Sequence, residues 1–207
     1  EISKMSKITN TGVHIVEGSA AAADTGGEGQ IWVKSDTPSS LYYTDDAGTD
    51  FRMGGVTLGT EASPTSGTTV DYTSIPPGVK RIVIAMEGMS WDGSGKPLIQ
   101  IGTGGGVETS GYVSQAWAAT NNAATATAGF VLAYNSDASY TSDGLIWLQS
   151  IESTGVTWVC ASQLAHSSSY YGSSTGIKTL SGVLDRVRIT SDNADDFDAG
   201  SVNISFD

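Results

Sequence analysis

Aromatic residues in loop-like segments are the residues whose types and setting most clearly suggest binding chemistry. They share Gly, Ser or Asn neighbours and lie outside the segments with strand-like alternation. The set is Trp91, Tyr112, Trp117, Tyr140, Tyr170 and Tyr171, with Asp92 beside Trp91. An exposed ring stacks on the apolar face of a sugar while nearby polar groups bind its hydroxyls, so this set predicts a glycan-binding surface. The alternative is that some of these rings cover the ends of a β domain, as Trp32, Trp147 and Trp158 are expected to fill strand cores.

Within that set, Trp91-Asp92 and Tyr170-Tyr171 are the two preferred patches, because each places two binding side chains together. Acidic residues offer a second kind of chemistry. The loop carrying Asp192, Asp195, Asp196 and Asp198 is a weak Ca²⁺ candidate, since its spacing departs from the EF-hand pattern. No other cofactor is expected.

Catalytic arrangements are poorly supported by the sequence. Paired carboxylates for glycoside hydrolysis would come from the acidic loop, Asp92 or the group at 45–50, where Asp45 more simply caps its own turn. A Ser-His-Asp triad could be built on His166, but Ser and Asp are too frequent for this to be specific. The glycine run at 102–106 lacks the Lys-Ser/Thr ending of a phosphate loop. We therefore predict that the protein is not an enzyme and has no catalytic residues.

Charge and composition exclude several classes of partner. The 207 residues include 22 acidic and 10 basic side chains, which gives a formal net charge of -12. Such a chain repels phosphate backbones, so we expect no nucleic-acid binding. The longest apolar run, at 82–86, is far shorter than the ~20 residues of a membrane span, and no membrane insertion is expected. Cys160, the single cysteine, has no disulfide partner and lies in an apolar strand pattern, which predicts a buried, inert thiol.

The elements that position these residues are predicted to be strands throughout. Short alternating segments separated by Gly, Pro, Asn and Asp turns predict an all-β protein. We expect an extended N-terminal arm over 1–29, a small β-meander over 30–56 as an assembly segment, a linker over 57–69 and an antiparallel β-sandwich or jelly-roll-like head domain over 70–207. Three short strands cannot bury both faces alone, so the meander should pack on copies of itself or on the larger domain.

Four runs of the sequence resemble segments of known proteins. The run from Gly29 to Asp50 and the later runs at 73–82, 180–190 and 197–204 resemble virion structural proteins of tailed bacteriophages, of the tail-fibre and appendage type found in aquatic phages. The resemblance implies a trimeric β-structured appendage that contacts the host through its C-terminal domain. No catalytic residues are implied.

Sequence therefore predicts a virion-located tail fibre or receptor-binding appendage. Its expected partners are copies of itself in a homotrimer, other virion proteins through the N-terminal arm, and a host-surface glycan. A capsid decoration protein, using the arm to clamp the shell, is the main alternative. A carbohydrate-binding module is the third alternative, and a tailspike glycosidase is the fourth.

Overall fold

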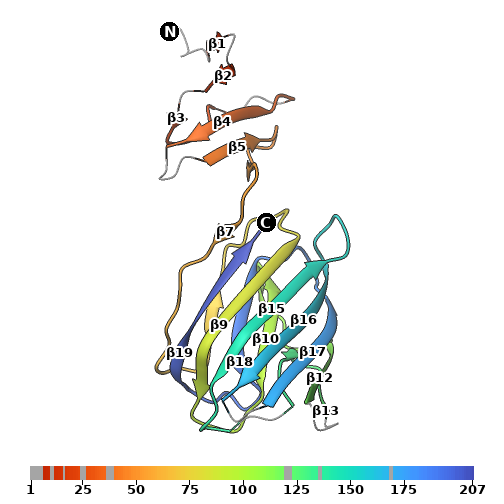
Figure 1. Ribbon diagram of the computed structural model, residues 1–207. Helices are drawn as coiled ribbons and strands as arrows, with labels where there is room; N and C mark the ends of the chain where they lie inside the picture. Colours follow the sequence, from red (N-terminus) through yellow and green to blue (C-terminus); the bar gives the residue numbers. More distant parts are fainter. Residues whose placement is uncertain are drawn as a thin grey trace. The chain divides into compact units, whose positions relative to one another are not determined.

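The computed structural model describes residues 7–9, 12–15, 17–23, 27–35, 40–118, 123–134, 137–167 and 170–207. Every regular element in these ranges is a β-strand, which confirms the predicted all-β class (Figure 1). The chain divides into two compact units, Glu1–Gly55 and Val56–Asp207. A search of the described ranges finds no helix with the length and apolar content needed to cross a membrane.

The first unit contains a hairpin and a mixed four-stranded sheet. The hairpin pairs β1 (Lys7–Thr9) with β2 (Gly12–His14). The sheet has the order β3 (Glu17–Gly18), β4 (Gln30–Lys34), β5 (Ser40–Thr44), β6 (Asp50–Arg52), with β3 parallel to β4 and the other pairs antiparallel. The predicted meander is therefore present. Within the predicted arm over 1–29, the described residues include the hairpin and the edge strand β3.

The second unit contains two sheets that enclose one main core. The larger sheet curls into a half-barrel with the order β13 (Ala123–Ala126), β12 (Val113–Ala118), β17 (Tyr170–Thr179), β16 (Thr157–His166), β15 (Ser142–Ser150), β9 (Arg81–Trp91), β19 (Phe197–Phe206), β7 (Thr57–Leu58). The smaller sheet has the order β11 (Gly106–Val107), β10 (Pro97–Thr103), β18 (Arg186–Ser191), β8 (Val70–Tyr72), and β14 (Phe130–Val131) also pairs with β10. All pairs in both sheets are antiparallel, as the sequence predicts for this domain.

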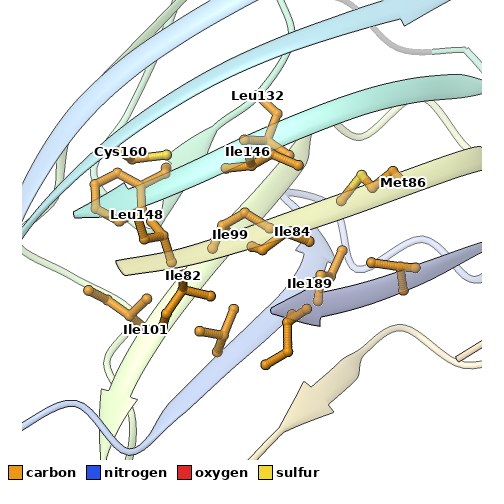
Figure 2. Packing of buried hydrophobic residues seen from close by; sticks show 14 of the residues in the cluster. Ile82, Ile84, Met86, Ile99, Ile101, Leu132, Ile146, Leu148, Cys160 and Ile189 are labelled. Carbon is orange, nitrogen blue, oxygen red and sulfur yellow. The ribbon is translucent and has the colours of Figure 1, made fainter. Parts of the chain in front are cut away.

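Alternation along the strands explains the core between the sheets. Ile82 and Ile84 of β9 are fully buried, and Val83 between them faces outward. From the smaller sheet Ile99 and Ile101 point toward them (Figure 2). Cys160 is fully buried in the same cluster, so the prediction of a core thiol is confirmed. Removing such β-branched side chains from water supplies about 2 kcal/mol each, and the core fixes which side of each strand faces solvent.

The strand β17 is a feature that sequence reasoning missed. Its Gly/Ser/Thr content suggested a loop, yet it pairs with β16 over ten positions, from Thr157↔Thr179 to His166↔Tyr170. The small residues have a packing reason: a Cβ on Gly176 would lie 2.7 Å from the Phe130 ring. Close approach of the strand to that ring therefore requires glycine.

Residues 57–69 run along the second unit, where the sequence predicted a linker. β7 pairs with β19, and Ala62 forms an isolated bridge with Val202. Both Ala62–Val202 backbone hydrogen bonds are formed, at 2.9 and 2.8 Å. These contacts cover the edge of β19, which explains why a Gly/Ser/Thr-rich segment is ordered there.

Candidate functional site

The outer face of the larger sheet brings two of the predicted aromatic residues together. We define this outer face as the solvent-facing side of β12, β17, β16 and β15. Trp117 on β12 is 41 % exposed and Tyr171 on β17 is 65 % exposed. Trp117 is paired with Ser173, two residues from Tyr171 on the same side of β17, so the two rings occupy diagonal positions. Diagonal side chains in an antiparallel pair lie ~7 Å apart, within reach of one ligand.

Polar groups around the two rings are neutral. Gln163 is exposed on β16 opposite Ser173, and Gln115 lies half-buried on β12. Neither side-chain amide has a hydrogen-bond partner among the described residues. Both amides are therefore available to donate to and accept from a ligand's hydroxyl groups.

Charge is absent from the central part of this face. On β12, β16 and on the described side chains of β17, every outward-facing residue is uncharged. The charged residue of β17, Lys178, points inward and is buried. The charged residues that give the chain its formal net charge of -12 therefore lie outside this part of the face. A neutral, weakly apolar face suits a ligand that carries hydroxyls and no charge.

Trp91 and Tyr112, predicted as exposed loop aromatics, are buried, and that part of the prediction is wrong. Trp91 ends β9, is 2 % exposed and packs on Phe197 with ring centroids 5.3 Å apart. Tyr112 is 1 % exposed, accepts a hydrogen bond from the Ile101 amide at 2.8 Å, and meets Phe130 edge-on. Burial raises the pKa of the Tyr112 hydroxyl. These rings fill the ends of the sandwich, the alternative considered from the sequence.

The remaining aromatic residues of the predicted set, Tyr140 and Tyr170, lie at one end of the second unit. Tyr140 is half-buried in the turn after Asp137, whose carbonyl accepts its amide hydrogen at 2.9 Å. Tyr170 pairs through its backbone with His166, and its side chain lies outside the described residues. The patch Tyr170-Tyr171 is thus described only at Tyr171.

Asp92 and the acidic loop meet each other, but they do so as turn-stabilising groups. The Asp92 carboxylate accepts the Asp196 amide at 2.9 Å, and the Asp195 carboxylate accepts the Gly95 amide at 2.6 Å. Asp192 accepts the Lys96 amide at 2.7 Å, while Asp198 is exposed on β19. In the described part of the chain, no three acidic, His or Cys side chains gather as a metal-binding group. The carboxylates proposed for Ca²⁺ instead join two loops through backbone amides.

His166 pairs with a serine, the arrangement that a triad would need. Its Nδ1 lies 3.1 Å from the Ser142 hydroxyl, but both side chains are more than nine-tenths buried. Burial lowers the pKa of His166, an effect that the charge of Asp143 opposes in part. Its Nε2 atom is buried, with no hydrogen-bond partner in the described part of the chain. Asp45, the other group considered for chemistry, accepts the Ala47 and Thr49 amides and so caps its own turn, as predicted.

The first unit has an exposed apolar face of its own. Ile31, Tyr43 and Phe51 are cross-strand neighbours on β4, β5 and β6, and they are 58 %, 40 % and 36 % exposed. Leu41 and Met53 extend the same side. On the opposite side, Trp32 is covered by Tyr42 and donates to the Thr44 hydroxyl at 2.9 Å. One side of this small sheet is therefore covered within the unit, while the other presents a continuous apolar surface.

Comparison with known proteins does not assign the chain to a class. A scan against protein-family models, a search of curated proteins and a search of solved structures each gave no match.

Proposed function

We propose that this chain is a non-enzymatic structural protein of a virion, of the tail-fibre or receptor-binding appendage type, and that it binds host-surface glycan. The observation that carries the proposal is the uncharged part of the outer face formed by β12, β17 and β16, with its exposed rings Trp117 and Tyr171. Rings of this kind stack on sugars, and the amides of Gln115 and Gln163 offer hydrogen bonds to hydroxyl groups. Because this surface is neutral, it neither attracts cations nor repels the glycan.

Assembly is the second part of the proposal. The apolar face of β4, β5 and β6 exposes several large side chains next to one another, and contiguous exposed apolar patches of this kind mark interaction sites. A homotrimer in which copies cover this face for one another would stabilise the small sheet. It would also place several outer faces on one appendage, which multiplies a weak affinity for single glycans. The N-terminal segment would then attach the appendage to other virion proteins.

Glycan-array binding by the full chain tests the proposal. We expect selective binding to neutral glycans, with at least a tenfold loss of affinity for Trp117→Ser and for Tyr171→Ser, since one stacked ring contributes about 1.4 kcal/mol. Val113→Ser is the matched control, because Val113 is 72 % exposed on the same strand and face as Trp117. Equal loss in the control, or no binding by the wild-type chain, would contradict the proposal.

A capsid decoration protein is the second candidate, favoured by the exposed apolar face of the first unit. That face would lie against the shell instead of against other copies. Antibody-gold labelling of intact particles separates the two locations. We expect label at the tail or its tip, whereas label over the head would support decoration.

A further inference from the structure

A cavity lies where β15, β9 and β19 run side by side, beyond the strands that carry Trp117 and Tyr171. It has a volume of about 130 Å³ and lies entirely within the second unit. Its lining residues are Val56, Arg81, Val83, Trp147, Ser205, Phe206 and Asp207. The strand register explains this grouping: Trp147 of β15 is paired with Val83 of β9, which is paired with Ser205 of β19.

Trp147 faces this cavity because of the alternation along β15. Its neighbours Ile146 and Leu148 are fully buried in the core, so the indole between them points to the opposite side of the sheet and is half-buried. The sequence prediction placed Trp147 in the core, and the structure contradicts it. The ring therefore offers an aromatic surface in a hollow, the setting in which sugars stack.

Two polar side chains form the rim of the cavity. The Arg81 guanidinium donates through Nε to Asp207 Oδ1 at 2.9 Å and through Nη2 to Oδ2. The two side chains remain 53 % and 35 % exposed. This paired arrangement leaves the Nη1 hydrogens of Arg81 and lone pairs of the Asp207 carboxylate for other partners. A donor and an acceptor are thus fixed side by side near the indole, with the Ser205 hydroxyl on the lining.

We propose that this cavity binds one neutral pyranose residue of a glycan, with its ring stacked on Trp147 and its hydroxyls bonded to Arg81 and Asp207. The inference rests on the proposed function, because it takes a sugar as the ligand of the same sheet. A neutral sugar fits better than an acidic one, since Asp207 already neutralises Arg81. The formal charge of -12 on the chain also opposes an anionic ligand.

Strand spacing separates this site from the pair Trp117 and Tyr171. Trp147 lies on β15, three strands away from β12, and the register offsets Trp117 by two further residues. With neighbouring strands ~4.8 Å apart and a rise of ~3.3 Å per residue, the two tryptophans are roughly 16 Å apart along the sheet. They therefore contact different sugar residues, and the cavity selects one unit of a longer glycan.

Saturation-transfer NMR on the full chain tests the site with the methyl glycosides of glucose, galactose, mannose and N-acetylglucosamine. We expect one of them to bind the wild type, with at least a tenfold weaker Kd for Trp147→Leu and a fivefold weaker one for Asp207→Asn. Leu145→Ala is the matched control, since Leu145 is 40 % exposed two residues away on the same face of β15. Its Kd should stay within twofold of the wild type. Thermal melting of each variant verifies that it is folded.

The outcomes distinguish this inference from the proposed function. Unchanged binding by folded Trp147→Leu, while Trp117→Ser loses affinity on the array, overturns the cavity site and leaves the proposed function standing. Stronger binding of methyl glucuronide than of any neutral glycoside overturns the neutral-sugar assignment. Array binding by the wild type without binding of any of the four glycosides overturns the single-sugar site. Absence of glycan binding in both formats overturns the site and the proposed function together.

Discussion

Replacing Glu108 with glutamine removes the countercharge of a buried lysine. Lys178 points into the second unit with its side chain only 7 % exposed, and its ammonium lies 2.5 Å from the Glu108 carboxylate. The same ammonium donates to the Thr179 carbonyl at 2.8 Å and lies 5.5 Å from the centre of the Tyr112 ring. Glu108 also accepts the amide and hydroxyl of Ser181, at 2.8 and 2.7 Å. The pair thus ties the segment after β11 to β17.

The magnitude follows from the pKa of Glu108. Burial raises this pKa, but the hydrogen bonds from Lys178 and Ser181 outweigh burial and bring it from 4.5 to about 2. That change corresponds to about 3 kcal/mol of stability at neutral pH. Breaking a buried pair by removing one partner costs ~3–5 kcal/mol, in agreement. We expect Glu108→Gln to lose about 3 kcal/mol, or about 6–12 °C in Tm.

Urea unfolding followed by tryptophan fluorescence measures the loss. Glu87→Gln, an exposed carboxylate on β9, is the matched control and should stay within about 0.5 kcal/mol of the wild type. The stabilisation from Glu108 is complete above its ordinary pKa and is lost as pH falls from 4.5 to about 2. The difference between wild type and variant should therefore shrink over that interval. A loss below 1 kcal/mol at pH 7, or a difference unchanged by acid, would refute the reasoning.

Three further predictions concern single positions in the second unit. Gly200→Ala should lower the free energy of unfolding by about 2 kcal/mol or more, because Gly200 has φ +94 and an added Cβ would lie 2.5 Å from the Gly88 backbone. Gly104 is the control, since its Cβ would meet open space, and Gly104→Ala should change little in the same urea assay. Cys160 should resist a thiol reagent until the chain unfolds, since burial raises its pKa, and rapid labelling of native protein would contradict this. Burial lowers the pKa of His166 in the folded state, so the stability of the protein should fall as the pH drops below 6.5. His166→Asn should flatten this pH dependence. An equally steep dependence in the variant would show that His166 does not cause it.

Sequence pattern predicted the strands that alternate clearly and missed those built from small residues. The apolar alternation around Ile82 and Ile84 identifies β9, because one side of that strand is buried by both sheets. In β17 the inward positions include Gly172, Ser174 and Gly176, which carry little hydrophobic signal. Their small size matters only because another strand and an aromatic ring approach closely, a long-range contact absent from local sequence.

Which of the candidate aromatic residues are exposed was only partly predictable from the sequence. Trp117 and Tyr171 are exposed as expected, whereas Trp91 and Tyr112 fill the ends of the sandwich, since a Gly-rich neighbourhood does not reveal whether a ring turns inward. Trp147 shows the converse. Trp147 lies on a strand that contributes to the core. Its neighbours Ile146 and Leu148 point inward, and because side chains alternate along a strand, Trp147 points to the other side. Reading that parity from the sequence would have identified it as outward-facing.

A crystal structure of the full chain with the best neutral oligosaccharide from the array tests the central claim most directly. The account predicts sugar rings stacked on Trp117 or Tyr171 on the outer face, with a further ring on Trp147 when the glycan is long enough. Sugar bound only at the loops around Asp92 and Asp195, with the outer face bare, would contradict it.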